Sequence, residues 1–222
     1  RYGEIIQRSK ILPDGREVLL AYVPRDERGD RDRPWRDPGR DLPPLRLNIP
    51  ISQYVLDATV ADEGDYYDFL EEPPVERVER IYSVDEVKYS ARIRDKVRRI
   101  DMDTLTFDTG SANIPRDQVD DLGGVADAIS KVLDRNPGET FLIEGHTDAV
   151  GSDESNLILS DERAETVANA LSAVYGIPPE NLVTQGYGER YLKVRTQGPE
   201  RLNRRVTIRR ITPLISPVAS AQ

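Results

Sequence analysis

Apolar residues recur at helical spacing in two stretches of the C-terminal half of the chain. The first stretch precedes Asn136-Pro137-Gly138 and contains Leu122, Val125, Ala126, Ile129, Val132 and Leu133. The second precedes Gly176 and contains Ala164, Val167, Ala168, Leu171 and Val174. Spacings of three and four residues place these side chains on one helical face, and Gly and Pro commonly follow a helix end. Two amphipathic helices are therefore predicted.

Short apolar segments surround the two helices and are predicted to be strands. They cover residues 105–107, 140–143, 182–187 and 206–211, which gives the order β-α-β-α-β-β. Helices that alternate with strands must cover a sheet, and a last strand without a crossover helix favours antiparallel pairing. The pattern predicts an α/β sandwich with a mixed sheet.

The first hundred residues have a less regular pattern and predict a smaller, mostly β and loop region. The expected elements are a β-hairpin at 5–23, a strand at 45–51, a short helix at 65–72, and a helix from Ser83 to Ile100. Pro13-Asp14-Gly15 favours the hairpin turn. Ser83 and Glu86 have the spacing of a capping box, which begins helices.

Composition divides the chain into an accessory region at 1–82, a main domain at 83–213 and a disordered tail at 214–222. Within the accessory region, residues 24–44 contain six Arg and six acidic residues among Pro and Gly. Such a self-neutralising polar segment buries too little apolar surface to offset its chain entropy. It is predicted to be a linker.

Charge and composition exclude several classes of function. The 31 basic and 40 acidic residues give a net charge of −9, so nucleic acid is not an expected partner. The absence of Cys excludes disulfides, thiolate catalysis and Cys-bound metals. No apolar stretch approaches the roughly 18 residues of a membrane-spanning helix. Because the chain opens at Arg1 without a signal-like pattern, any signal peptide or anchor is expected outside residues 1–222.

The densest group of functional side chains follows the predicted strand at 140–143. Asp148 lies in a Gly-flanked segment there, and Asn156, Ser160 and Arg163 share one face of the following helix. Ligands of α/β sheets bind at the carboxyl ends of strands, so Asp148 and Arg163 are expected to flank one small pocket. One fixed anion and one fixed cation suit a zwitterionic amino-acid head. The alternative is a structural Asp148–Arg163 salt bridge that fixes the loop on the helix.

Five motifs resemble the OmpA-like peptidoglycan-binding domain family over roughly residues 100–213. They are Phe107-Asp108-Thr109-Gly110-Ser111-Ala112, Glu144-Gly145-His146-Thr147-Asp148 with Gly151-Ser152, Asn156-x-x-Leu159-Ser160-x-x-Arg163-Ala164, Gly186-Tyr187-Gly188-Glu189 and Asn203-Arg204-Arg205-Val206. The resemblance implies non-covalent binding of Gram-negative peptidoglycan through the diaminopimelate of its stem peptide. No catalysis and no cofactor are expected, because neither Asp148 nor Arg163 is a nucleophile and no Ser, His and acid group surrounds them.

The resemblance also implies roles for individual residues. Asp148 would bind the ammonium of diaminopimelate and Arg163 its carboxylate, with the neighbouring ligand-binding residues Thr147, Asn156, Asp108, Thr109 and Arg204. The expected location is the periplasm, on the cell wall, with a tether to the outer membrane outside this sequence. A protein partner or membrane anchor is expected to act through residues 1–82 or a segment before them.

A metal-dependent hydrolase acting on cell-wall material is the alternative function. Glu144, His146 and Asp148 alternate, so a continued strand would point all three side chains the same way. Such a group can bind a divalent metal and activate water. A third hypothesis is an interaction module for another protein that uses the N-terminal region.

Two further groups of residues have a structural interpretation, and for the first a functional alternative stays open. Tyr187 and Tyr191 lie beside glycines and are expected either to pack at a strand end or to stack on a sugar. Arg204, Arg205, Arg209 and Arg210 form two basic pairs. Alternation along the last strand is expected to leave at least one Arg of each pair in solvent.

Overall fold

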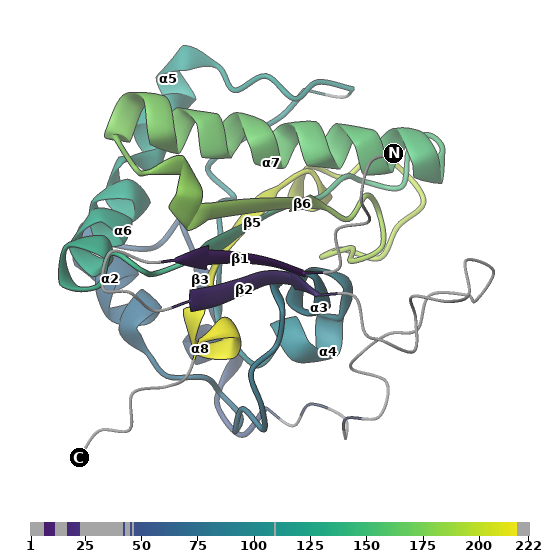
Figure 1. Ribbon diagram of the computed structural model, residues 1–222. Helices are drawn as coiled ribbons and strands as arrows, with labels where there is room; N and C mark the ends of the chain where they lie inside the picture. Colours follow the sequence, from purple (N-terminus) through teal and green to yellow (C-terminus); the bar gives the residue numbers. More distant parts are fainter. Residues whose placement is uncertain are drawn as a thin grey trace, which may run out of the picture.

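The computed structural model describes residues 7–11, 17–22, 42, 45, 47–108 and 110–216 (Figure 1). The predicted linker at 24–44 lies outside the described residues except for Leu42, and so do residues 217–222 of the predicted tail. None of the described helices, including the 23-residue α7 (Asp153–Tyr175), combines the length and apolarity needed to span a bilayer.

A five-stranded mixed sheet forms the centre of the molecule. Its strands, in spatial order, are β3 (Val55–Asp57), β4 (Arg99–Asp101), β7 (Val206–Arg210), β5 (Phe141–Gly145) and β6 (Leu182–Gly186). β3 runs parallel to β4 and β5 parallel to β6, whereas β7 pairs antiparallel with both β4 and β5. The predicted mixed sheet and its antiparallel last strand are confirmed.

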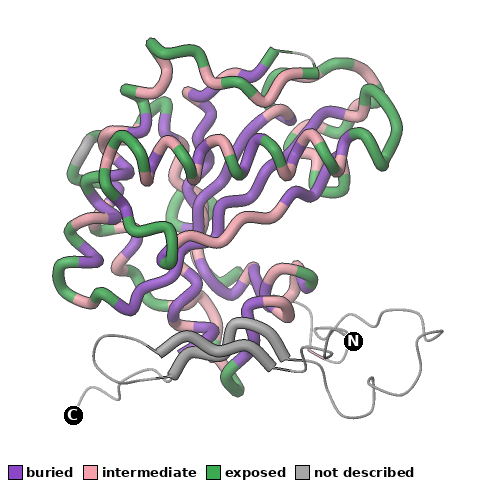
Figure 2. Tube along the Cα trace, turned by 45° about the horizontal axis from the view of Figure 1, so that its top comes forward, coloured by how far each residue is buried: buried purple, intermediate pink, exposed green. Residues whose placement is uncertain are grey.

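Helices cover both faces of this sheet (Figures 1 and 2). One face packs against α2 (Glu63–Glu71), α6 (Gly123–Arg135) and α7, and the other against α3 (Val84–Tyr89), α4 (Ala91–Arg94) and α8 (Thr212–Ile215). Phe141 and Ile143 of β5 enter the first core and Leu142 the second, because successive strand residues point to opposite faces.

The remaining elements are short connections and one hairpin. They are β1 (Gln7–Ile11), β2 (Glu17–Tyr22), α1 (Ile51–Tyr54), α5 (Arg116–Val119), and the 3-10 helices η1 (Asp120–Leu122), η2 (Pro179–Asn181) and η3 (Arg201–Asn203). β1 and β2 pair antiparallel, which confirms the predicted hairpin.

The two long helices confirm the prediction from periodicity, and so do two short ones. α7 ends at Gly176, whose φ of 74° is the left-handed conformation that glycine adopts readily. α2 matches the helix predicted at 65–72 but begins two residues earlier. α3 begins as predicted, with the Ser83 hydroxyl accepting from the Glu86 amide and the Glu86 carboxylate accepting from the Ser83 amide.

Three predicted elements are wrong. The described residues of 45–51 form no strand, because α1 begins directly after Pro50 and the strand follows at Val55. Residues 105–107 follow an irregular path in which Leu105 and Phe107 are buried without strand pairing. The helix predicted from Ser83 to Ile100 is divided at Ser90 into α3 and α4, α4 ends at Arg94, and Ile100 lies in β4. Burial explains the apolar pattern of the last two segments, whereas Leu47 and Ile51 are exposed.

The structure also differs from the predicted domain division. β3 and α2 come from residues 1–82, yet β3 extends the sheet, and Tyr66 and Leu70 of α2 enter the same core as α6. At the other end, Leu214 and Ile215 are buried in α8 and therefore belong to the folded body instead of a tail. Residues 51–216 consequently pack as one continuous fold.

Two paired glycines bring α7 against the sheet. Gly145 of β5 is the register partner of Gly186 of β6. A Cβ at Gly145 would lie 1.8 Å from the Ser160 carbonyl oxygen, and one at Gly186 would lie 2.3 Å from the Asp161 backbone nitrogen. Only residues without a side chain allow this approach. The contact fixes the first half of α7 beside the carboxyl ends of β5 and β6.

Gly145→Ala is therefore expected to lower the free energy of unfolding by about 1–3 kcal/mol, the usual cost of overpacking. Gly64→Ala in α2 is the control, because its added Cβ meets no atom within 4 Å. Urea unfolding followed by circular dichroism measures both variants. Equal stability of the two variants would contradict the close contact.

Candidate functional site

The loop after β5 carries the predicted site and is held by three segments of the chain. Its His146 amide donates to the Arg205 carbonyl at 3.0 Å, and its Thr147 amide donates to the Gly188 carbonyl at 3.0 Å. At the other end of the loop, the Ser152 hydroxyl accepts from the Ser155 amide and caps α7. Asp148 is consequently placed between α7 and the long connection from β6 to β7.

Asp148 is buried and forms an ion pair with Arg204. The Arg204 guanidinium lies 2.8 Å from Asp148 Oδ2, which also accepts from the Glu200 amide at 3.2 Å. Asp148 Oδ1 accepts from the Val150 amide at 3.3 Å. Asp148 thus pairs with Arg204, so the predicted alternative of an Asp148–Arg163 salt bridge is wrong.

Arg163 is fully buried and ties three backbone segments together. Its Nε donates to the Ser111 carbonyl at 2.9 Å, and its two terminal nitrogens donate to the carbonyls of His146 at 3.1 Å and Asp108 at 3.2 Å. The guanidinium also lies over the Phe107 ring, 4.8 Å from its centre. These bonds use three of its five N–H groups.

The charge state of Arg163 reflects this burial. Desolvation, and after it the nearby Arg204, lower the pKa of Arg163 to about 10, although Asp148 opposes them. Arg163 therefore remains a cation at neutral pH. Its three carbonyl contacts give it a structural role in addition to the predicted ligand-binding role.

The other predicted site residues lie around this pair. The Asn156 amide nitrogen donates to the Asp148 carbonyl at 3.3 Å and to Glu189 Oε2 at 2.8 Å. Thr147 is buried, and its hydroxyl has no hydrogen-bond partner among the described residues. Asp108 contributes its carbonyl while its side chain is exposed. Thr109 lies outside the described residues.

The structure contradicts the metal site of the alternative function. The carboxylate of Glu144 lies 2.6 Å from Arg94 Nε and 3.1 Å from Arg209 Nε, and it accepts from the Thr207 hydroxyl. Burial raises the pKa of Glu144, but Arg209 and Arg94 outweigh it and hold the pKa below its usual value. Within the part of the chain that the structure describes, no three His, Asp or Glu residues are placed to hold a metal.

His146 is a buried, neutral side chain. Burial lowers the pKa of His146 well below its usual value, and Arg205 lowers it further. Neither ring nitrogen makes a hydrogen bond to a described residue. The ring lies beside Tyr187, 5.7 Å between centres.

The arginines at and beside the last strand are less exposed to solvent than predicted. Arg205 and Arg209 are buried, and Arg210, 20% exposed, forms an ion pair with Glu139 at 2.7 Å. The signal that could have shown this is Glu144 within a fully buried strand, because a buried carboxylate requires a cationic partner. Tyr187 packs as expected at the end of β6, and its hydroxyl donates to the Lys88 carbonyl at 2.7 Å.

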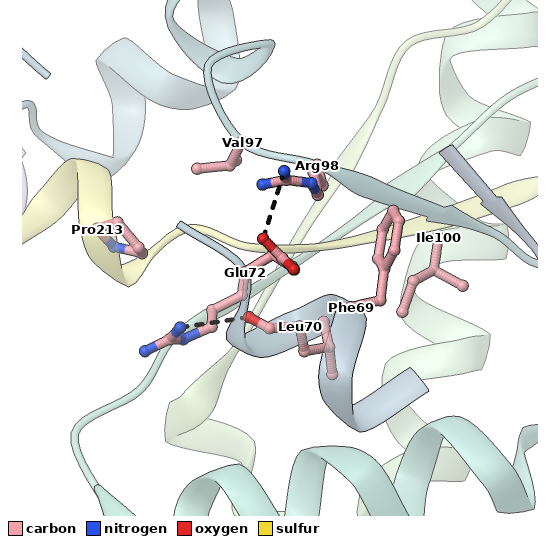
Figure 3. A pocket seen from close by; sticks show the side chains of 8 residues that line it. Phe69, Leu70, Glu72, Val97, Arg98, Ile100 and Pro213 are labelled. Atoms are coloured by element: carbon pink, nitrogen blue, oxygen red, sulfur yellow. Dashed lines mark hydrogen bonds and ion pairs between the residues drawn. The ribbon is translucent and has the colours of Figure 1, made fainter. Parts of the chain in front are cut away.

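A small cavity between α2 and β4 lies apart from these residues (Figure 3). It encloses about 10 Å³, and its lining includes Phe69, Leu70, Val97, Ile100 and Pro213. Arg98 and Glu72 form an ion pair beside it at 3.5 Å. It contains none of the predicted site residues and is too small for a ligand larger than water.

Comparisons with known proteins agree with the motifs. A family model described as the OmpA family matches residues 106–205. Outer membrane porin F of Pseudomonas aeruginosa is 32% identical over 94 residues, which are 42% of this chain and 25% of that protein. The probable lipoprotein YiaD of Escherichia coli is 31% identical over 112 residues, which are 44% of this chain and 49% of that protein. The chain thus spans between a quarter and a half of these relatives.

A solved structure was also matched. The peptidoglycan-associated lipoprotein from Burkholderia pseudomallei is 25% identical, with a TM-score of 0.40, over 47% of this chain and 86% of that chain.

Replacement of Glu144 by Gln tests the buried ion cluster. Glu144→Gln leaves Arg94 and Arg209 without their shared anion and is expected to cost about 3–5 kcal/mol at pH 7. Glu165→Gln, on an exposed turn of α7, is the control and should change stability by less than about 0.5 kcal/mol.

The pH dependence follows from the lowered pKa of Glu144. Stabilisation by a carboxylate whose folded pKa is lowered is complete above its unfolded pKa of about 4.3 and is lost as the pH falls further. The stability difference between wild type and Glu144→Gln should therefore shrink by up to about 1.4 kcal/mol per pH unit below about pH 4.3. Urea unfolding between pH 7 and pH 3 measures it. A constant difference would contradict the ion cluster.

Proposed function

Because residues 106–205 belong to the OmpA family, we propose that this chain binds peptidoglycan without a covalent bond and anchors an envelope protein to the cell wall. The observation that carries the proposal is the group formed by Asp148, Arg204 and Arg163 at the carboxyl end of β5. It offers one anion and two cations to a ligand that carries charges of both signs.

Diaminopimelate of the stem peptide supplies the matching charges. Its side-chain ammonium binds the carboxylate of Asp148 in place of the Arg204 guanidinium, which is the more exposed partner of that ion pair, at 16% against 5%. Its carboxylate accepts from the two N–H groups that Arg163 has left. Thr147 precedes Asp148 in the same loop, and Asn156 of α7 donates to that loop. Asp108 and Thr109 are assigned to the site from their motif.

The proposal includes binding without catalysis. The support is that the side chains a metal-dependent hydrolase would use have other environments. Glu144 forms ion pairs with two arginines, and His146 is buried and neutral. We place the protein in the periplasm, since the relatives are named as an outer membrane porin and a lipoprotein. A tether to the outer membrane, or a partner protein, acts through residues 1–82 or a segment before them.

Asp148→Asn is expected to weaken co-sedimentation with insoluble diaminopimelate-type peptidoglycan by roughly tenfold to a hundredfold. The reason is that a neutral amide gives the ligand's ammonium no charge-assisted partner. Asp153→Asn, exposed in the first turn of α7, is the matched control and should bind as wild type does. Circular dichroism checks that both variants are folded. Wild-type binding by folded Asp148→Asn would contradict the site.

Arg163→Lys is expected to reduce the preference for diaminopimelate over lysine in the stem peptide. The Lys side chain introduced at position 163 keeps a cation near the three carbonyls. It lacks the two parallel N–H donors with which Arg holds a carboxylate. Wild type should prefer a diaminopimelate peptide over its lysine analogue by roughly tenfold or more.

Calorimetry at matched salt measures the four affinities of this comparison. Arg116→Lys, on an exposed turn of α5, is the control and should keep the wild-type preference. Equal affinity of wild type for the two peptides would show that Arg163 does not recognise the ligand's carboxylate.

A further inference from the structure

A basic groove lies beneath the connection between β6 and β7. It has a volume of about 660 Å³, and five of its ten lining residues are cationic: Arg99, Arg190, Lys193, Arg195 and Arg205. Glu189 is its one acidic lining residue. Such a concentration of positive charge is unexpected in a chain with a net charge of −9.

Three of these cations form no ion pair with a described residue. Arg99 donates to Asp101 at 2.9 Å, and Lys193 lies 3.2 Å from Asp101 and also pairs with Asp103. By contrast, Arg190 and Arg195 are exposed and form no ion pair with a described residue. Arg205 forms none with a described residue either.

Arg205 is the strongest indication of a ligand. It is 3% exposed, and its guanidinium donates to the Tyr191 carbonyl at 3.0 Å. Its Nε and Nη1 make no hydrogen bond to any described residue. A buried guanidinium with unused donors is costly to a fold unless it binds an anion, and here it lines the same groove as Arg190 and Arg195.

The connection that lines the groove also contacts the Asp148 loop. Glu189, in the groove wall, accepts from Asn156, whose amide nitrogen also donates to the Asp148 carbonyl. Farther along the same connection, the Glu200 amide donates to Asp148 Oδ2. A peptide bound at Asp148 therefore lies next to the groove.

We propose that this groove binds a second carboxylate of the same acidic peptide, so that Asp148 holds the diaminopimelate end and Arg190, Arg195 and Arg205 hold the preceding residue. The inference rests on the proposed function. The stem peptide fits because its D-glutamate, joined through the side chain, leaves its α-carboxylate free beside the diaminopimelate. Arginine binds such a carboxylate with paired donors.

Two tripeptides test the inference by calorimetry with the full chain. One is L-Ala-γ-D-Glu-meso-diaminopimelate, and the other has the glutamate α-carboxylate replaced by an amide. Wild type should bind the free acid roughly threefold to thirtyfold more tightly. Asp148→Asn should weaken both peptides alike.

Arg190→Ala combined with Arg195→Ala should bind both tripeptides with the affinity that wild type has for the amide. Both side chains are exposed, so the double variant leaves the core intact. Arg201→Ala is the matched control, because Arg201 is an exposed cation of the same connection outside the groove lining, and it should keep the wild-type preference.

Different results overturn different claims. Equal wild-type affinity for the two tripeptides, with weaker binding by Asp148→Asn, overturns the groove and leaves the proposed function standing. Binding of neither tripeptide overturns both. An unchanged preference in the double variant, or displacement of both tripeptides alike by inorganic phosphate at matched ionic strength, also overturns the carboxylate assignment.

Discussion

The direct backbone contact between α7 and the sheet at Gly145 and Gly186 is the constraint from which the site follows. Because no side chain separates them, the Ser160 hydroxyl is close enough to accept from the Gly188 amide at 2.8 Å. The same approach brings Asn156, four residues earlier, to the Asp148 loop, and Arg163, three residues later, to three carbonyls. A Cβ at Gly145 or Gly186 would push α7 away from the sheet and so disturb all of these contacts.

A buried ion cluster performs the equivalent task on the opposite face. Arg209 donates to the Val97 carbonyl at 2.7 Å and to Asp95 at 2.9 Å, while sharing Glu144 with Arg94. Residues 94–97 are thereby joined to β5 and β7 by charge as well as by apolar contact. This explains why residues 94–97, although they precede the family-matched range, belong to the same folded body as the sheet.

Sequence patterns were most informative for α6 and α7. In both, apolar residues recur at helical spacing over several turns, and Gly or Pro follows the helix end. The patterns were misleading at 105–107, where apolar residues are buried without strand pairing, and at 45–51, where a two-residue alternation precedes a helix instead. The motifs predict Asp148 and Arg163 as site residues, but they do not predict Arg204 as the ion-pair partner of Asp148. That partner depends on the path of the irregular connection from 187 to 205, which cannot be predicted from the spacing of apolar residues.

The sheet order has a consequence for shorter versions of this protein. The family-matched range 106–205 contains β5 and β6 but ends before β7, and it excludes β4 and β3 as well. A fragment cut to that range would leave β5, all five residues of which are buried in the whole chain, with an open edge. Unpaired apolar edges recruit strands from other molecules. The flanking segments therefore act as built-in protection against aggregation, and recombinant fragments should retain them.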